Sequence, residues 1–265
     1  MNLPLFWKSL KDQRKSVSWW IFGLLVLFTV QLWVYPTIKK SASDLQKFLD
    51  LYPDALKKIF RMQDYTSGPG YLSTELFSLM LPIIVISIGC AAGARAGAQE
   101  EEDGTADILL ALPVSRLSIL ATKVLANLFV LVGVGIIMFS ALAIGAPIVD
   151  LKMGTLHLSA GVVSCTLLGI TFTSLTTMTS ALSGRRGMAL GVGVASAVAF
   201  YVLFSLASLV KTFEHLLPVN PFQWTIGNAP LFNGFDWWGI LKLATASLVF
   251  FAISAWGFNR RDIRA

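Results

Sequence analysis

The chain has 265 residues, of which 55% are hydrophobic and 14% are charged, whereas a typical soluble domain carries about 25% charged residues. This composition excludes a disordered chain, a collagen and a coiled coil, and it indicates an all-α integral membrane protein. Two cysteines are too few for a disulfide scaffold. The net charge of +6 does not indicate a nucleic-acid binder, because the basic residues lie at the ends of apolar runs.

The first segment of the chain is amphipathic. Its apolar side chains repeat at helical spacing, and lysine and arginine residues lie between them. We therefore predict that residues 1–16 form a helix in the cytoplasmic membrane interface. Two interpretations stay open for this helix: an ordinary membrane anchor, or a connecting helix that also contacts a cytoplasmic partner. The apolar residues are Leu3, Phe6, Trp7 and Leu10.

Six apolar stretches follow, each close to the roughly 20 residues that cross a bilayer core. Lys242 is the one charged residue inside them. This near absence of charge is what a spanning role requires, because a charge at mid-bilayer costs about 2.5–3.5 kcal/mol. The sequence thus predicts a single transmembrane domain over residues 1–265. The six spans are residues 17–35, 76–94, 124–145, 158–182, 188–209 and 237–257.

The orientation of the spans follows from lysine and arginine. With six spans both termini lie on the same side, and that side carries twelve of these residues, whereas the opposite side carries nine. Six of the nine fall in one connection, residues 36–75, so the short connections on that side hold very few. We therefore predict a multi-pass protein of the cell (inner) membrane with both termini in the cytoplasm.

The outer connection, residues 36–75, contains a second amphipathic segment. One face of residues 43–61 is apolar, Ser43 can cap its start, and Pro53 interrupts it. We predict two short helices on the outer membrane surface. Packing against the spans and an interaction with substrate both fit this pattern.

Catalytic patterns are missing from the sequence. His157 and His215 lie in separate connections, without acidic or cysteine neighbours at metal-ligand spacing, so we predict no catalytic and no metal site. There is no G-x-x-x-x-G-K-[ST] loop for ATP, and the spans hold no Asp or Glu for a proton relay. If the protein moves a substrate, we expect the energy to come from another protein.

The connection between the second and third spans is the most informative segment. Residues 99–103 read Gln-Glu-Glu-Glu-Asp, apolar residues fill 108–112, and Pro113 ends the segment. Thr105 can serve as an N-cap, and acidic side chains are favourable at a helix N-terminus. We predict a short cytoplasmic helix whose apolar stripe needs a partner surface. From physical chemistry alone, a re-entrant segment or a solvated linker is the alternative.

This connection resembles the coupling-helix region of ATP-binding-cassette (ABC) exporter permeases of the second type. The similarity lies in the acidic run, Gly104-Thr105, the acidic residue at 107, the leucine-rich turn and Pro113-Val114-Ser115-Arg116. Tyr52-Pro53-Asp54-Ala55-Leu56 is similar to the outer segment of many such permeases. Asn220-Pro221-Phe222 is similar to their Ser-Pro-Phe, with Asn in place of Ser. The resemblance covers nearly the whole chain.

The resemblance implies a permease subunit that pairs with a second permease chain, identical or different, above two cytosolic ABC ATPase subunits. ATP and Mg²⁺ would bind to the ATPase, and this chain would bind no cofactor. Pro113 and Arg116 would set the turn into the third span. The alternative is a membrane scaffold or assembly factor that recruits a cytosolic protein without transport. The residues implied to dock into the ATPase are Glu100, Gly104, Thr105, Asp107, Ile108, Leu109 and Leu110.

The fourth predicted span is unusually rich in hydroxyl groups, since ten of its 25 residues are Ser or Thr. Several of them recur on one helical face. Hydrogen bonding between or within helices is one interpretation of this stripe, and the lining of a hydrated transport pathway is the other. The stripe consists of Ser159, Thr166, Thr173, Thr177 and Ser180.

Small residues repeat in two other spans. Gly89, Gly93 and Gly97 are spaced by four residues, as are Gly187 and Gly191, and such repeats permit close helix contacts. We expect packing within the chain, with a dimer seam as the alternative. Pro82 is expected to kink the second span, because it cannot donate a hydrogen bond to the carbonyl of Ser78.

Overall fold

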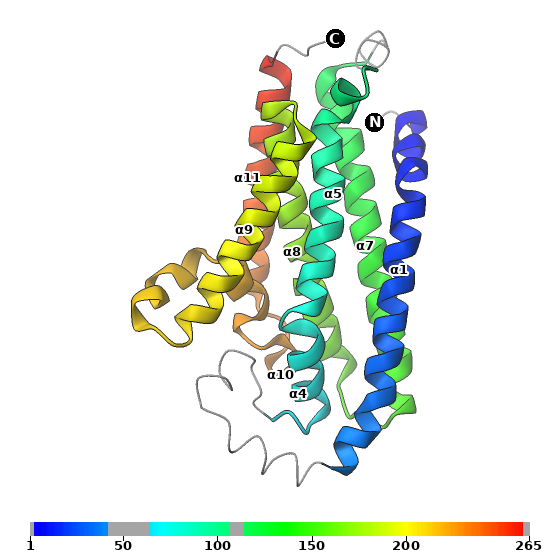
Figure 1. Ribbon diagram of the computed structural model, residues 1–265, viewed down its shortest axis with the longest axis vertical. Coiled ribbons are helices and arrows are strands. Elements are labelled where there is room, and N and C mark those ends of the chain that lie inside the picture. Colours follow the sequence, from blue (N-terminus) through cyan, green and yellow to red (C-terminus); the bar gives the residue numbers. More distant parts are fainter. Residues whose placement is uncertain (1–2, 42–63, 106–113, 262–265) are drawn as a thin grey trace.

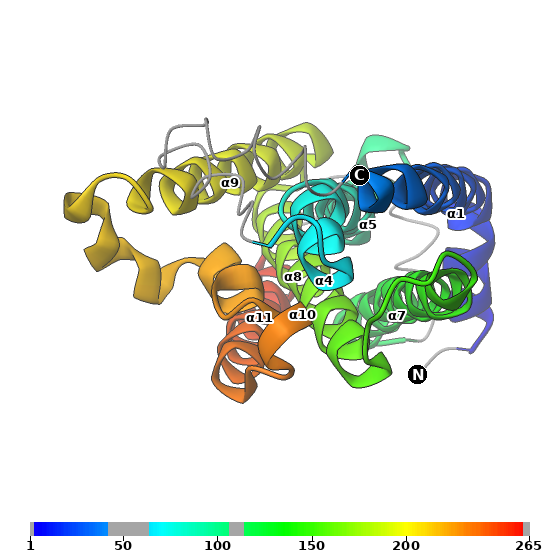
Figure 2. The ribbon, with the colours of Figure 1, turned by 90° about the horizontal axis from the view of Figure 1, so that it is seen from below.

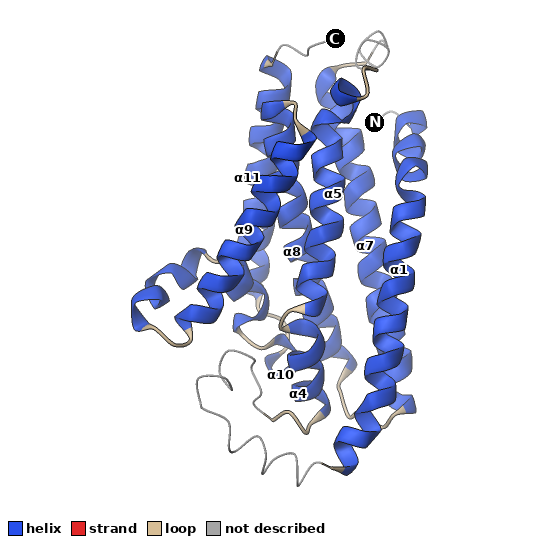
Figure 3. Ribbon diagram, in the orientation of Figure 1, coloured by secondary structure: helices blue, strands red, loops and turns tan. Residues whose placement is uncertain are grey.

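The computed structural model describes residues 3–41, 64–105 and 114–261, and these ranges contain helices and no strand (Figure 3). Short helices connect the long ones: α4 (Gly68–Leu72), α10 (Pro230–Asn233), the π-helices η1 (Ser73–Phe77) and η3 (Gln223–Gly227), and the 3-10 helix η2 (Lys211–Val219). The six long helices are α1 (Leu3–Lys40), α5 (Met80–Glu102), α7 (Arg116–Ile148), α8 (Thr155–Ser183), α9 (Arg186–Ala207) and α11 (Trp237–Arg260).

Six candidate membrane spans occur in the described ranges, which confirms the predicted all-α membrane fold. The second of them runs from Gly68 to Glu102 and joins α4, η1 and α5. The helices are longer than most predicted spans, because helix-forming residues continue beyond the apolar stretches. The fifth is the exception, since α9 ends at Ala207, two residues before the predicted limit of 209. The amphipathic outer segment 43–61 and the motif 52–56 lie outside the described residues.

The N-terminal prediction differs from the structure. Residues 3–16 are the first turns of α1, which continues unbroken to Lys40, rather than a separate interfacial helix. No helix-breaking residue lies between Pro4 and Gly23, and Gln13 is buried, so nothing turns the chain along the membrane surface. The Gln13 side chain donates a hydrogen bond to Asn127 on α7 (2.9 Å). This contact joins the first turns of α1 to the side of α7.

α8 occupies the centre of the bundle, with α5, α7, α9 and α11 around it and α1 at the edge (Figure 2). Within the most apolar window of each helix, 72% of α8 is buried, compared with 11% of α1 and 11% of α9. Small side chains explain this position, because serine, threonine, glycine and alanine let neighbouring helices approach closely.

The first glycine repeat packs against α8. A Cβ atom at Gly93 would lie 2.2 Å from Thr176 Oγ1, and one at Gly97 would lie 2.5 Å from the backbone nitrogen of Ala181. The predicted packing within the chain is therefore correct for Gly89, Gly93 and Gly97. It is wrong for Gly187 and Gly191, where an added Cβ would meet nothing within 4 Å.

Helix α5 begins after a break in the second span. Leu79 has a φ of −144°, which interrupts the helix between η1 and α5. Pro82 lies in the first turn of α5, where its missing N–H has little cost, and Ile83 donates to the carbonyl of Leu79 (3.0 Å). The expected irregularity at Pro82 is thus present, as a break ahead of the proline.

Six helix ends meet at one end of the bundle (Figure 1). They are the start of α1, the end of α5, the start of α7, the end of α8, the start of α9 and the end of α11. This arrangement brings the acidic run 100–103 together with basic residues from distant parts of the sequence.

Candidate functional site

The candidate site begins where α5 ends. Gly104 has a φ of +65°, the left-handed conformation that glycine adopts without strain. The N–H of Thr105 donates to the carbonyl of Glu100 (2.8 Å), and the N–H of Gly104 donates to that of Glu101 (3.4 Å). These two bonds form a Schellman motif, so Gly104 and Thr105 terminate α5.

The three glutamates therefore occupy the last turn of α5, not the N-terminus of a coupling helix as predicted. Residues 95–102 are mostly good helix formers and contain no proline, so α5 continues past the predicted limit at 94. A carboxylate near a helix C-terminus is unfavourable by about 0.3–1 kcal/mol. The partners of these glutamates on other helices compensate for that unfavourable position.

Glu100 forms an ion pair with Lys123 on α7. The Lys123 side chain is 8% exposed, and its ammonium group also donates to the carbonyl of Ala96 on α5 (3.3 Å). A lysine so deeply buried is stable as a cation only with such partners. This pair joins the end of α5 to the second turn of α7.

Glu101 forms an ion pair with Arg261, the residue that follows α11. Both side chains are largely buried. Burial lowers the pKa of the Arg261 guanidinium, but this group is so basic that it stays charged at neutral pH. The backbone carbonyl of Arg261 accepts a hydrogen bond from Arg116 Nη1 at the start of α7 (2.8 Å).

Glu102 contacts the start of α9. Its Oε1 accepts a hydrogen bond from the backbone N–H of Arg186 (2.7 Å), the first residue of that helix. A carboxylate at this position satisfies one of the unpaired N–H groups at the N-terminus of α9 and interacts favourably with the helix dipole. The three consecutive glutamates thus contact α7, the end of α11 and α9. We call this group the helix-end junction: Glu100, Glu101, Glu102, Arg116, Lys123, Arg186 and Arg261.

A small polar pocket of about 100 Å³ lies beside the junction, between α1, α5 and α7. Its floor contains Asn127, which is 2% exposed and donates to the carbonyl of Ala92 (3.1 Å). Gln13 of α1 bonds to the same asparagine. The first turns of α1 are therefore attached to the end of the bundle that carries the junction.

Of the residues implied to dock or to set the turn into the third span, the structure describes four. The side chains of Glu100 and Arg116 face partners within the junction, whereas Gly104 and Thr105 are exposed. Asp107, Ile108, Leu109, Leu110 and Pro113 lie outside the described residues. The start of α7 is capped by Ser115, whose side chain accepts from the N–H of Ser118 (3.3 Å), so the cap combines with the Arg116 contact to fix this turn.

The predicted hydroxyl stripe of α8 is mostly enclosed by protein. Thr173, Thr177 and Ser180 are buried, and their hydroxyls donate to carbonyls of their own helix or, for Ser180, also to Gly93 on α5 (3.0 Å). Such bonds satisfy the hydroxyls without water. The helix-packing interpretation accounts for these three residues, and a role in a transport pathway stays a prediction.

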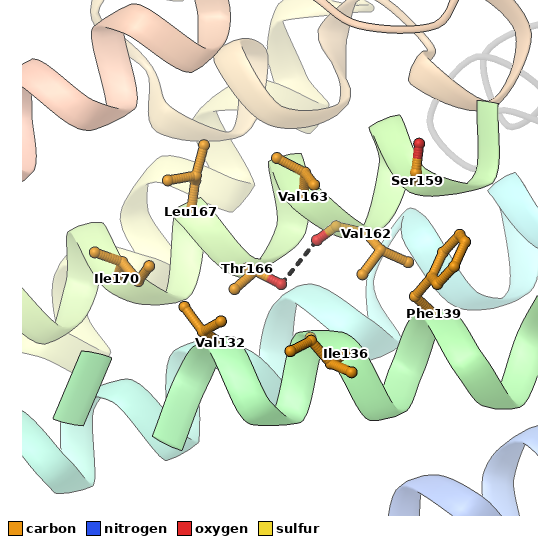
Figure 4. A pocket seen from close by; sticks show the side chains of 10 residues that line it. Val132, Ile136, Phe139, Ser159, Val162, Val163, Thr166, Leu167 and Ile170 are labelled. Carbon is orange, nitrogen blue, oxygen red and sulfur yellow. Dashed lines mark hydrogen bonds between the residues drawn. The ribbon is translucent and has the colours of Figure 1, made fainter. Parts of the chain in front are cut away.

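The other two stripe residues, Ser159 and Thr166, line a pocket of about 400 Å³ between α7 and α8 (Figure 4). The other lining residues are apolar, among them Val132 and Ile136 of α7. Thr166 donates its hydroxyl proton to the carbonyl of Val162 (2.8 Å). Ser159 likewise donates to the carbonyl of Leu156 (2.8 Å), so the pocket presents hydrocarbon rather than free hydroxyl groups.

The motif Asn220-Pro221-Phe222 connects α9 to the last span. Asn220 is fully buried, its Nδ2 donates to the carbonyl of Phe200 (2.8 Å), and its Oδ1 accepts from the N–H of Phe222 (2.9 Å). The ring of Phe222 packs edge-on against the ring of Tyr201 on α9, and the two ring centroids are 5.4 Å apart. In this structure the motif holds the connection between α9 and α11 against residues 200 and 201 of α9.

Sequence reasoning missed the partners of the acidic run. Lys123, Arg186 and Arg261 were counted only as cytoplasmic charges, although they contact the glutamates in the structure. Lys123 gave one usable signal, because it lies one residue before an apolar span, where a lysine needs a partner or a path to water. Arg186 and Arg261 are distant from the glutamates in sequence, and no local pattern indicates that they contact them.

These features define a polytopic α-helical membrane protein with an ion-paired junction where its helices meet. In comparison with family models, residues 3–263 match the model described as ABC-2 family transporter protein. The chain therefore belongs to the ABC-2 transporter family, which supplies the membrane-spanning permease component of ABC transporters and works with an ABC ATPase. A search of the curated proteins found no match. The family match confirms the resemblance inferred from residues 99–116.

Proposed function

We propose that this chain is the permease subunit of an ATP-driven exporter, with both termini in the cytoplasm. Two permease chains pair, and two ATPase subunits dock beneath them and bind ATP and Mg²⁺. One observation carries the proposal: the connection 103–115 leaves and re-enters the bundle at the helix-end junction. A docked protein that displaces this connection acts directly on the ends of α5 and α7.

The junction extends that action to other helices. Glu102 contacts the N-terminus of α9, and Glu101 contacts Arg261 at the end of α11. Displacement of α5 is therefore transmitted to helices that the connection does not include. We infer that this transmission alternates access to the two sides of the membrane.

The chemistry of the spans supports an external energy source. The six predicted spans contain no Asp or Glu, and the sequence has no G-x-x-x-x-G-K-[ST] loop. In this proposal the chain has no ATPase site of its own, and its energy enters from the cytosol.

Purification of the chain from native membranes, followed by mass spectrometry, tests the proposal. We expect a co-purifying ATPase whose hydrolysis of ATP depends on this chain. A stable cytosolic partner without nucleotide chemistry would instead support the scaffold or assembly factor.

A substitution in the connection tests the docking role. Leu109→Asp places a charge on the apolar stripe that the resemblance assigns to the ATPase, and we expect at least a tenfold loss of chain-dependent ATP hydrolysis, or about 1.4 kcal/mol. Leu216→Asp is the matched control, because Leu216 is an exposed residue of η2, which follows the end of α9 opposite the junction. Full ATP hydrolysis by the Leu109→Asp complex would refute the docking role.

A further inference from the structure

Arg261 contacts both sides of the connection 103–115. Its guanidinium forms an ion pair with Glu101 in the last turn of α5. Its backbone carbonyl accepts a hydrogen bond from Arg116 in the first turn of α7 (2.8 Å). One residue at the end of α11 thus joins the helix before the connection to the helix after it.

The turn between α8 and α9 covers this contact. Gly184 has a φ of +66°, and a Cβ atom there would lie 2.3 Å from Arg261 Nη1 and 2.7 Å from Glu101 Oε2. A side chain at this position would force the Arg261 and Glu101 side chains to shift. The turn that follows α8 therefore lies directly against the guanidinium.

The guanidinium depends on Glu101. The Arg261 and Glu101 side chains are 17% and 15% exposed, so solvent screens the pair only weakly. Within the described part of the chain, Arg261 Nε and Nη1 are buried without a hydrogen-bond acceptor. Loss of Glu101 would leave a largely buried cation without its acceptor, which favours separation of the two helix ends.

The adjacent Arg260 provides a comparison. It is exposed, and its guanidinium lies 5.0 Å from the ring centroid of Trp256 on the same helix. This cation–π contact stays within α11 and joins no second helix. The contact between helices is therefore specific to Arg261. A basic residue elsewhere at the end of α11, such as Arg260, does not make it.

We propose that Arg261 is a positioning residue that holds the end of α11 to both α5 and α7, so that α11 moves with them. Its role in transport rests on the proposed function. Its role in holding the helix ends together is a property of this chain alone, so the two can be tested separately.

The first experiment measures the distance between α5 and α11 in the full chain in lipid nanodiscs. Spin labels are attached at Asp103→Cys and Asn259→Cys, both exposed positions, and pulsed electron paramagnetic resonance gives the distance distribution. The native thiols of Cys90 and Cys165 are buried, so the introduced thiols react first. We expect one narrow distribution for the otherwise unchanged chain.

Variants of the pair test the contact itself. We expect Arg261→Gln and Glu101→Gln each to broaden the distribution at least twofold, and the matched control Arg260→Gln to leave it unchanged. The exchange of charges, Glu101→Arg with Arg261→Glu, is expected to narrow it again. Unchanged distributions in both glutamine variants would overturn the proposal, and so would an equal broadening in Arg260→Gln.

The second experiment uses the complex with the co-purified ATPase. The same label pair is measured without nucleotide and after trapping with ATP and vanadate. We expect equal distances in the two states for the unchanged chain, and different distances for Arg261→Gln. Separation of α5 and α11 on trapping of the unchanged chain would overturn the proposal, whereas the lack of any co-purifying ATPase would count against the proposed function alone.

Discussion

At the scale of single residues, backbone conformation decides where the acidic run lies. The sequence 100–105 fits the start of a helix as well as the end of one, because glutamates favour the first turn and Gly-Thr can precede a helix. The left-handed conformation of Gly104 and the two hydrogen bonds of the Schellman motif make this segment the C-terminal end of α5. The glutamates are thereby directed toward α7, α9 and the end of α11.

Gly104 is therefore expected to tolerate few replacements. Gly104→Pro cannot adopt the positive φ and removes the N–H that bonds to Glu101, so we expect a loss of about 1–2 kcal/mol at the end of α5 and impaired chain-dependent ATP hydrolysis. Gly104→Asn is the control, because asparagine visits this conformation. Thermal unfolding in detergent and ATPase assays measure both effects. Equal behaviour of the two variants would contradict the role of the conformation.

Asn220 offers a second prediction at this scale. Asn220→Ala leaves the carbonyl of Phe200 and the N–H of Phe222 without their partner, and each such buried group costs about 1–3 kcal/mol. We expect a clearly lower melting temperature in detergent. Asn228→Ala, an exchange at an exposed asparagine of the same connection, is expected to leave it unchanged. A similar melting temperature for both variants would argue against the structural role of Asn220.

At the scale of elements, the central position of α8 explains its composition. Its hydroxyl groups donate mostly to carbonyls of its own helix, and Gly169 admits α5 at short distance, since a Cβ atom there would lie 3.1 Å from Val85. Ser247 of α11 and Thr171 of α8 share a hydrogen bond at 3.0 Å. A helix that is buried on most sides in this way needs small, self-satisfied side chains rather than large apolar ones.

The contact between α5 and α8 is expected to be sensitive to volume. Gly93→Val adds atoms where a single Cβ would already lie 2.2 Å from Thr176 Oγ1, and overpacking of this kind costs about 1–3 kcal/mol. Gly191→Val is the matched control, since that glycine has open space beside it. We expect a lower melting temperature for the first variant only. If both melt alike, the close contact does not stabilise the bundle.

At the scale of the whole molecule, polar contacts occur at both ends of a largely apolar bundle. The helix-end junction lies at one end. At the other end, Lys39 of α1 forms an ion pair with Asp150 in the turn between α7 and α8 (2.5 Å), and the hydrogen bond from Lys39 lowers the pKa of that carboxyl. Both ion-paired regions lie outside the hydrocarbon core in the proposed orientation, and Lys242 is the one charged residue inside a predicted span.

The proposed orientation can be tested with thiol labelling in intact cells. A membrane-impermeant maleimide is expected to label Leu216→Cys from outside, and Asp103→Cys only after the membrane is opened. The native chain is the control, because Cys90 and Cys165 are buried and should stay unlabelled. Labelling of Asp103→Cys in sealed cells would reverse the orientation.

The sequence by itself determined the class of protein. The length of the apolar stretches and the near absence of charge in them predict six spanning helices, because a bilayer tolerates neither short apolar segments nor unpaired charges. Residues 99–116 were sufficient to indicate the transporter family. Local composition is sufficient for the prediction of the spans, because each segment that crosses the bilayer must by itself be long enough and apolar enough.

Only the tertiary structure decided which residues meet. Glu101 and Arg261 are 160 positions apart, and no local pattern links them. The direction of the acidic run depends on a single backbone conformation at Gly104, and the first turns of α1 contact α7 through a hydrogen bond from Gln13 to Asn127, 114 positions away. Such pairings arise from the packing of helices against one another, which the periodicity of any one helix does not encode.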